Sequence, residues 1–108
     1  MTISIPASIT SYYAAEQAGD FGTLAGCFAP DGTLRDEGQL QTGRAAIAAW
    51  MADAKRRYNH RTEVLGIDER DGSFVVSVRV AGNFPNSPVT LEQRFRLEDD
   101  RIRRLEIG

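Results

Sequence analysis

Residues 89–98, VTLEQRFRLE, decide the fold. Apolar and polar side chains alternate along this stretch, which predicts a strand with one buried and one solvated side, because successive side chains point to opposite faces. The buried side carries Val89, Leu91, Phe95 and Leu97. Gln93 is the polar residue in the middle of that side, and a buried amide without partners costs about 1–3 kcal/mol. Gln93 therefore indicates either a local hydrogen bond or a cavity lined with polar groups.

The flanking segments predict three more strands in a meander. A strand near His60–Arg70 is expected to meet a second strand, Ser73–Gly82, through Asp71-Gly72, which is a strong hairpin signal. After a loop, Asn83 to Pro88, and the central strand, the last strand is expected at Arg101–Ile107. Its alternation is imperfect and indicates a bulge. The second strand should face inward with Phe74, Val76, Val78 and Val80.

Three helices are expected in the first half of the chain. The first is Pro6 to Ala18, where Glu16 falls near the centre of an apolar stripe formed by Ile5, Ile9 and Tyr12 or Tyr13. Asp20 is placed to cap a second, short helix carrying Phe21, Leu24 and Phe28. Thr42 is placed to cap the third, Gly43 to Tyr58. Its stripe is Ile47, Trp50, Met51, Ala54 and Tyr58.

A short strand at Thr33–Glu37 is expected between the second and third helices. Pro30-Asp31-Gly32 would end the second helix with a turn, and a loop containing Gly38 would follow the strand. Leu34 and Asp36 would share one face of it. Because one-sided strands need a cover, the chain should form an α+β fold. The predicted architecture is a cone-shaped, curved antiparallel sheet packed on three helices in the order ααβαββββ, as one domain spanning residues 1–108.

Composition excludes several classes of function. With 108 residues, a net charge of −2 and a sequence pI near 5.3, the chain lacks the basic character of nucleic-acid-binding proteins. The sequence contains no long apolar run, so no membrane partner is expected. The single cysteine, Cys27, and single histidine, His60, make a metal site improbable, and no cofactor is implied. A cytoplasmic location is expected.

Three polar side chains from distant segments are expected to point into the interior. They are Tyr12 from the first helix, Asp36 from the short strand and Gln93 from the central strand. A strongly twisted sheet around a long helix tends to leave a cavity, and such cavities are common ligand sites. Each residue also has a structural interpretation: Asp36 as a carboxylate paired with Arg35 or Arg44 or simply solvated, Tyr12 as a core tyrosine, and Gln93 as a satisfied amide.

Four segments carry a family resemblance that covers nearly the whole chain. They are YYAAEQAGD at 12–20, FAPDGTLRD at 28–36, TGRAAI at 42–47 and QRFRL at 93–97. In these segments the chain resembles the superfamily of nuclear transport factor 2-like proteins, ketosteroid isomerases and SnoaL-like polyketide cyclases. The resemblance implies the cystatin-like, nuclear transport factor 2-like fold. It is weaker evidence of activity, because this fold hosts many unrelated functions.

The resemblance also implies roles for the three residues. Against ketosteroid isomerase, Tyr12 falls at the oxyanion-hole tyrosine, Asp36 at the aspartate base, and Gln93 at a second aspartate that its apolar site keeps protonated. An amide at Gln93 donates a hydrogen bond without a pKa shift, but it should stabilise an enolate less. The implied chemistry is proton abstraction alpha to a carbonyl, leading to isomerisation or cyclisation of a small hydrophobic carbonyl compound.

Other residues are expected to complete this site. Leu34, Trp50 and Phe95 should desolvate Asp36 and raise its pKa. Glu16 is either a carboxylate that reaches solvent or pairs with an arginine, or a second carboxylate near the cavity. His60 is either solvated or at the rim of the cavity. The alternative function is a non-catalytic module of the same fold that binds a hydrophobic ligand or dimerises. A homodimer through the open sheet face is expected only from the resemblance.

Overall fold

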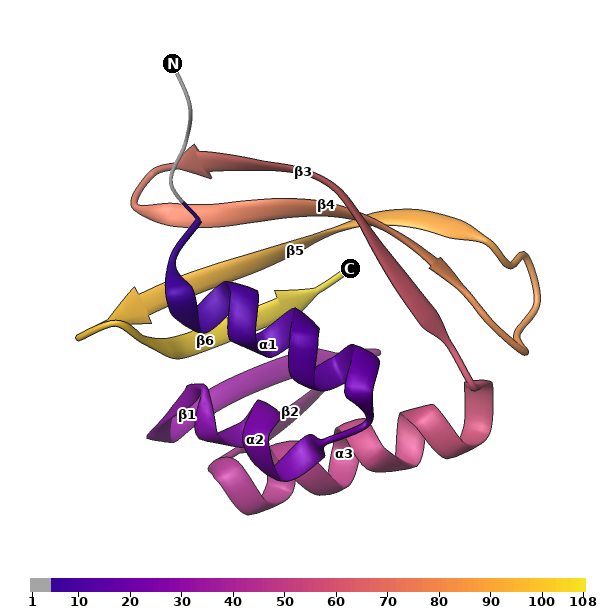
Figure 1. The fold of residues 1–108 in the computed structure, drawn as a ribbon, viewed down its shortest axis with the longest axis horizontal. Helices are drawn as coiled ribbons and strands as arrows, with labels where there is room; N and C mark the ends of the chain where they lie inside the picture. Colours follow the sequence, from indigo (N-terminus) through magenta and orange to yellow (C-terminus); the bar gives the residue numbers. More distant parts are fainter. Residues whose placement is uncertain (1–4) are drawn as a thin grey trace.

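The computed structural model describes residues 5–108, and its six strands form one sheet in the order β2-β1-β6-β5-β4-β3. The elements are α1 (Ala7–Ala18), α2 (Phe21–Gly26), β1 (Phe28–Asp36), β2 (Gln39–Thr42), α3 (Arg44–Tyr58), β3 (Arg61–Arg70), β4 (Ser73–Ala81), β5 (Val89–Glu98) and β6 (Arg101–Ile107). The sheet is strongly twisted, and the three helices lie on its concave side (Figure 1). The predicted α+β fold is confirmed.

The central strand has the predicted orientation. Phe95 is 0% exposed and Gln93 only 3%, while Arg94 and Arg96 beside them are exposed. On the neighbouring strand Phe74 lies opposite Phe95, and inward-facing residues of both strands join the core. The core also takes in Ile9, Tyr12, Leu24, Phe28, Leu34, Ile47, Met51, Ile102 and Leu105.

The hairpin and the bulge are also confirmed. Asp71 and Gly72 have φ values of 52° and 78°, as a tight turn with two left-handed residues requires. Between β5 and β6 the register shifts, so that Arg96 pairs with Arg104 but Leu97 pairs with Ile102. The extra residue, Arg103, lets both Ile102 and Leu105 face the core at 0% exposure.

The region around β1 differs from the prediction. The strand starts at Phe28, and its register against β6 shifts between Phe28 and Thr33, so the expected turn is an irregularity within the strand. This pairing is parallel, so the sheet is mixed rather than wholly antiparallel. The segment after β1 is not only a loop, because β2 folds back on β1 through Glu37 and Gly38, which have φ values of 52° and 73°. The order is therefore ααββαββββ.

The helices follow the prediction with two corrections. Asp20 caps α2, because its carboxylate accepts hydrogen bonds from the backbone N–H (3.1 Å) and hydroxyl (2.7 Å) of Thr23. Thr42 does not cap α3; it pairs with Thr33 in the β1–β2 ladder, and Gly43 occupies the N-cap without a side-chain bond. Ile5, expected on the buried stripe of the first helix, is 49% exposed and precedes α1.

Within residues 5–108, none of the helices combines the length and the apolar character that crossing a membrane requires.

Candidate functional site

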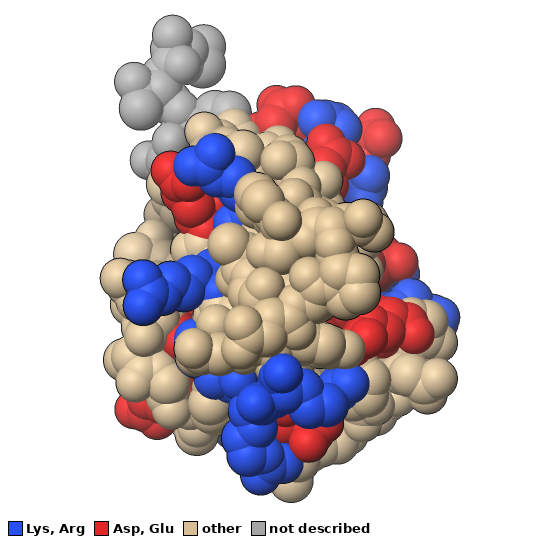
Figure 2. All heavy atoms as spheres, turned by 90° about the vertical axis from the view of Figure 1, so that its right-hand side faces the viewer, with Lys and Arg blue, Asp and Glu red and all other residues tan. Residues whose placement is uncertain are grey.

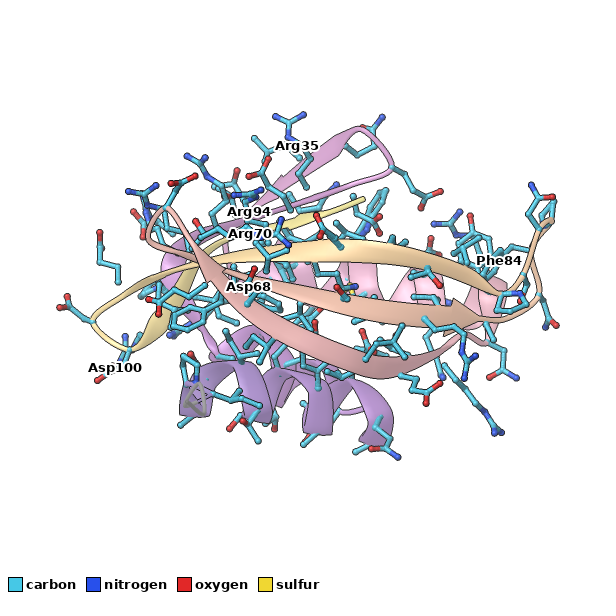
Figure 3. All side chains as sticks on the ribbon, turned by 90° about the horizontal axis from the view of Figure 1, so that it is seen from above. Arg35, Asp68, Arg70, Phe84, Arg94 and Asp100 are labelled. Carbon is cyan, nitrogen blue, oxygen red and sulfur yellow. The ribbon has the colours of Figure 1, made fainter. Side chains whose placement is uncertain are left out.

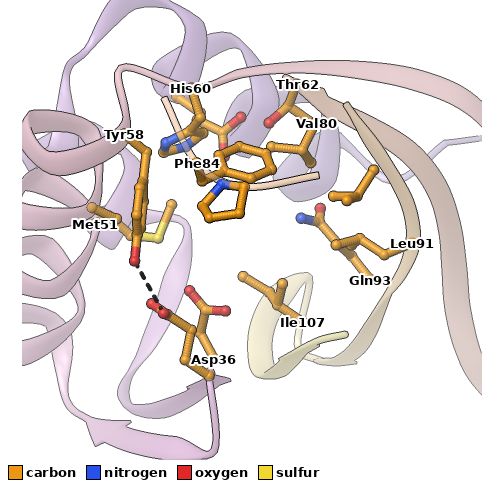
Figure 4. A pocket seen from close by; sticks show the side chains of 15 residues that line it. Asp36, Met51, Tyr58, His60, Thr62, Val80, Phe84, Leu91, Gln93 and Ile107 are labelled. Atoms are coloured by element: carbon orange, nitrogen blue, oxygen red, sulfur yellow. Dashed lines mark hydrogen bonds between the residues drawn. The ribbon is translucent and has the colours of Figure 1, made fainter. Parts of the chain in front are cut away.

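A cavity of about 300 Å³ lies where the curved sheet separates from the C-terminal half of α3. Its walls are mainly apolar, with contributions from Met51, Ala54, Val80, Leu91 and Ile107. The close-up shows polar side chains reaching it from opposite sides, with Asp36 on one wall and Gln93 on another (Figure 4). Because the walls come from α1, α3 and strands β1, β3, β4, β5 and β6, the site forms only when the fold is complete.

Asp36 is the half-buried carboxylate at the end of β1, where the chain turns into β2. The indole N–H of Trp50, in the middle of α3, donates a 3.0 Å hydrogen bond to its Oδ2. Burial raises the pKa of Asp36 above its ordinary value, and the bond from Trp50 partly opposes this rise. No Lys or Arg of residues 5–108 forms an ion pair with Asp36. Of the two alternative partners expected from the sequence, Arg44 donates to the carbonyl oxygen of Phe28 and Arg35 is exposed.

Gln93 is buried in β5 and has a defined partner. The hydroxyl of Tyr13 donates a hydrogen bond to its Oε1. With this oxygen engaged, the amide NH₂ is the part of the side chain that remains for the cavity, which Gln93 lines. Both readings of the sequence therefore apply to this residue, since it makes a local hydrogen bond and also faces a cavity.

Glu16 is a second carboxyl in the cavity wall. It lies in the last turn of α1 and is only 6% exposed. Burial raises its pKa, while the Thr62 side chain and the positive charge of Lys55 act in the opposite direction. A carboxyl in this position favours its neutral form more than an exposed glutamate does, and a neutral carboxyl can donate a hydrogen bond to a ligand.

The raised pKa of Glu16 predicts a pH-dependent effect of its replacement. Such a group contributes stability below its unfolded-state pKa, and this contribution is lost as the pH rises through the folded-state pKa. We expect Glu16→Gln to match the wild type in urea unfolding at about pH 3 and to be more stable at about pH 8. The exposed Glu98→Gln is the control. A Glu16→Gln protein less stable than the wild type at the higher pH would contradict this assignment.

His60 follows the end of α3 and also lines the cavity. Burial and the charge of Lys55 lower its pKa, and Asp36 partly compensates. The imidazole is therefore mainly neutral at pH 7, since the unperturbed value is already about 6.5. It sits beside the carboxylates as a polar, uncharged group rather than as a solvated cation.

The remaining residues expected in the site lie behind its walls. Tyr12 is 0% exposed, and its ring packs edge-to-face on Tyr13, Phe28 and Phe95. Its hydroxyl has no hydrogen-bond partner within residues 5–108. Burial and nearby Glu16 raise the pKa of this hydroxyl. Leu34 and Phe95 are core residues at 0% exposure, and Trp50 reaches the site through its bond to Asp36. None of these four lines the cavity itself.

The residues at the mouth of the cavity were not predicted from the sequence. Phe84 and Pro85, in the loop before β5, lie over it, and the Phe84 ring packs edge-to-face on Tyr58. Tyr58 in turn donates a hydrogen bond to Glu37 at 3.2 Å. The face of the molecule on this side presents a broad uncharged area with charged residues at its margins (Figure 2). The sequence feature that could have indicated this mouth is Phe84, an aromatic residue in a loop that otherwise consists of Asn, Ser and Pro.

Gly82 holds this loop against the end of α3. A Cβ at Gly82 would lie 2.7 Å from the carbonyl oxygen of Tyr58 and 2.9 Å from Cα of His60. We therefore expect Gly82→Ala to lower the free energy of unfolding by about 1–3 kcal/mol, as forced overpacking does. Urea unfolding tests this, with Gly66→Ala as the control because nothing lies within 4 Å of a Cβ there. Equal effects of the two variants would contradict the close approach at Gly82.

Comparisons with known proteins place this site in a family context. Residues 9–105 match the model of the SnoaL-like domain family. A candidate polyketide cyclase from Sinorhizobium meliloti is 36% identical, with a TM-score of 0.92 over 96% of this chain and 95% of that one. A protein from Sphaerobacter thermophilus is 27% identical, with a TM-score of 0.76 over 97% and 96%. No curated protein matches the sequence.

A more distant structure shares the fold alone. It is a protein with a ketosteroid isomerase-like fold from Catenulispora acidiphila, solved with trimethylamine, at 20% identity and a TM-score of 0.83 over 97% of this chain and 86% of that one. The match over residues 9–105 and the resemblance expected from the sequence agree. The chain belongs to the SnoaL-like domain family, within the ketosteroid isomerase-like, nuclear transport factor 2-like fold.

Proposed function

We propose that this protein is an enzyme that removes a proton alpha to the carbonyl of a small, largely apolar substrate. Asp36 is the base, and the amide of Gln93 donates a hydrogen bond to the oxygen that becomes negative. The resulting enolate is reprotonated elsewhere in an isomerase, or attacks a second carbonyl in a cyclase. The observation that carries the proposal is a carboxylate without an ion-pair partner among the described residues and a buried amide, both lining one apolar cavity.

The environment of Asp36 suits a base near neutral pH. A general base is most effective when its pKa approaches the operating pH, and burial moves the pKa of Asp36 upward from its ordinary value. Trp50 engages only one carboxylate oxygen, Oδ2, and the backbone N–H of Glu37 also favours the charged form. A substrate held against the apolar walls would add further desolvation and raise the basicity again.

The contacts of Gln93 suit an oxyanion donor. Preorganised donors lower a barrier because they are already oriented when charge develops. The hydroxyl of Tyr13 fixes the amide by bonding its oxygen, and the neighbouring strands hold the backbone of β5 on both sides. The amide therefore does not have to reorganise as the substrate oxygen gains charge.

The cavity supports a neutral and compact substrate. Its volume of about 300 Å³ is at the lower end of ligand pockets. Asp36 lines it as a carboxylate, and this negative charge would repel an anionic substrate. The likeness to the candidate polyketide cyclase, at 36% identity, is consistent with a substrate that carries carbonyl groups.

Deuterium exchange tests the proposal without knowledge of the natural substrate. A panel of small cyclic ketones and enones in D₂O is followed by proton NMR, with and without the protein. We expect protein-dependent loss of the alpha-proton signals of at least one compound, because abstraction by Asp36 and return of a solvent deuteron exchanges that position. Binding of panel members without any protein-dependent exchange would contradict the enzymatic proposal.

A second candidate is a non-catalytic module that binds a small ligand. It is favoured by Glu16 and Asp36, neither of which has an ion-pair partner among the described residues, since a small amine would supply the missing positive charge. The trimethylamine in the Catenulispora acidiphila protein fits this reading. NMR titration with trimethylamine distinguishes the two: saturable shifts around the cavity with no exchange of the ketone panel support the module.

A further inference from the structure

A second hollow, of about 210 Å³, lies on the opposite, outer face of the sheet. Three arginines, Arg94 and Arg96 of β5 and Arg104 of β6, line it together with Ser73. Two carboxylates, Asp71 and Glu106, complete its wall. This site shares no residue with the apolar cavity, so it is independent of the function proposed above.

The pairing of the strands forces the arginines together. Arg96 lies directly opposite Arg104 in the β5–β6 ladder, and Arg94 precedes Arg96 by two residues on the same face. Like charges placed directly across two strands destabilise a sheet. The bulge at Arg103 sets this register. The extra residue allows Arg104 to lie opposite Arg96 while Ile102 and Leu105 both face the core.

Internal ion pairs do not neutralise these arginines. Among residues 5–108, the ion pairs of the outer face join Arg70 to Asp68 and Glu92, and Arg79 to Glu63. Arg94, Arg96 and Arg104 take part in none of the ion pairs found there. Figure 3 shows the labelled side chains of Arg35, Arg94 and Arg70 on this side of the sheet. In the ladders Arg35 and Arg94 both lie opposite Glu106, and Arg70 lies opposite Ser73.

Ser73 adds a polar group to the hollow. It is only 6% exposed and lines the hollow. A serine hydroxyl can donate a hydrogen bond to an oxyanion. Guanidinium groups bind phosphate oxygens in pairs through parallel N–H groups, which makes them well suited to such a ligand.

We propose that this hollow binds a phosphate-type dianion, held by Arg94, Arg96 and Arg104 and by the hydroxyl of Ser73. The ligand would relieve the repulsion between Arg96 and Arg104. The same chemistry recognises free phosphate and the phosphate group of an ester. The two carboxylates in the wall leave a small positive excess, so affinity depends on direct contacts and falls as salt rises.

NMR titration of the ¹⁵N-labelled protein with inorganic phosphate, and separately with methyl phosphate, tests this site. Sodium chloride at equal ionic strength is the reference. We expect saturable shifts centred on Ser73, Arg96 and Arg104, with the ester arm showing whether the hollow also admits a phosphate group on a larger molecule. Shifts that do not saturate, or that sodium chloride reproduces, would overturn the proposal.

Matched variants locate the binding. We expect the double variant Arg96→Gln/Arg104→Gln to bind phosphate at least about tenfold more weakly, because charge-assisted hydrogen bonds are lost. Ser73→Ala should bind more weakly too, and Arg101→Gln, an exposed arginine of β6 outside the hollow, should bind like the wild type. An equal loss of phosphate binding in Arg101→Gln would overturn the proposal. So would a protein that sediments as a homodimer in analytical ultracentrifugation and binds no phosphate.

Discussion

Asp36→Asn should lower protein-dependent deuterium exchange of a responsive ketone by about 10²–10⁴-fold, the usual contribution of a general base. The amide keeps an oxygen that can accept the hydrogen bond from Trp50, but it has no basic lone pair comparable to that of the carboxylate. Because the ionised carboxylate is disfavoured by burial, its removal should leave the melting temperature unchanged or slightly higher at neutral pH.

The control for this variant is Glu37→Gln. Glu37 also lines the cavity, but its carboxylate accepts a hydrogen bond from Tyr58 and forms an ion pair with Arg57 at 3.7 Å. We expect its replacement to change exchange only slightly. Exchange that survives in Asp36→Asn, or a large fall in its melting temperature with exchange intact, would show that Asp36 is a structural carboxylate.

The pH profile gives an independent reading of the base. Exchange should rise with pH as Asp36 loses its proton and should level off above its folded-state pKa, which lies above the ordinary aspartate value. This profile should disappear in Asp36→Asn. If the profile persisted in the variant, another titratable group of the cavity, Glu16 or His60, would be responsible for it.

Local patterns in the sequence predict the strands and helices of this fold well. The strict alternation of residues 89–98 fixes which face of β5 is buried, and Asp71-Gly72 fixes the β3–β4 hairpin. The patterns do not predict the parallel pairing of β1 with β6, because nothing in either strand names a partner so distant along the chain. The four residues of β2 are mostly exposed, so they carry no apolar period to detect.

The candidate site is predicted only in part, for a similar reason. The cavity is lined by four of the predicted residues: Asp36, Gln93, Glu16 and His60. The sequence could indicate an inward direction because alternation in a strand and the period of a helix show which side faces the core. The same reasoning cannot separate a cavity wall from the solid core behind it, so Tyr12, Leu34 and Phe95 share the inward direction and yet do not line it. That distinction depends on how far the sheet stands from α3, which is a property of the whole fold.

The two adjacent tyrosines show how narrow this distinction is. Tyr12 and Tyr13 follow one another on α1, and their rings lie edge-to-face with centroids 5.1 Å apart. The hydroxyl of Tyr13 reaches Gln93, whereas that of Tyr12 stays buried without a partner among the described residues. Because Tyr12 does not line the cavity, its hydroxyl could contact a ligand only after the ligand or a neighbouring side chain moved toward it.

Gln93→Leu should lower exchange by about 10²–10³-fold, as the loss of one oxyanion donor does. Leucine is similar in size and retains the apolar contacts of β5, but it removes the amide NH₂ from the cavity and leaves the hydroxyl of Tyr13 without its partner. Stability should fall as well, by about 1–3 kcal/mol, because a buried hydroxyl loses its hydrogen bond. Exchange by NMR and unfolding in urea measure the two effects.

Tyr13→Phe separates these effects, because it removes the partner hydroxyl and keeps the amide. If Gln93 acts as the donor, Tyr13→Phe retains most of the exchange and loses only the orientation that the hydroxyl provides. The double variant Tyr13→Phe/Gln93→Leu should then recover stability relative to Gln93→Leu, since no polar group is left unpaired, while its exchange stays low. Recovery of exchange together with stability would instead mean that Gln93 acts only by supporting the fold, and the donor would have to be sought elsewhere in the cavity wall.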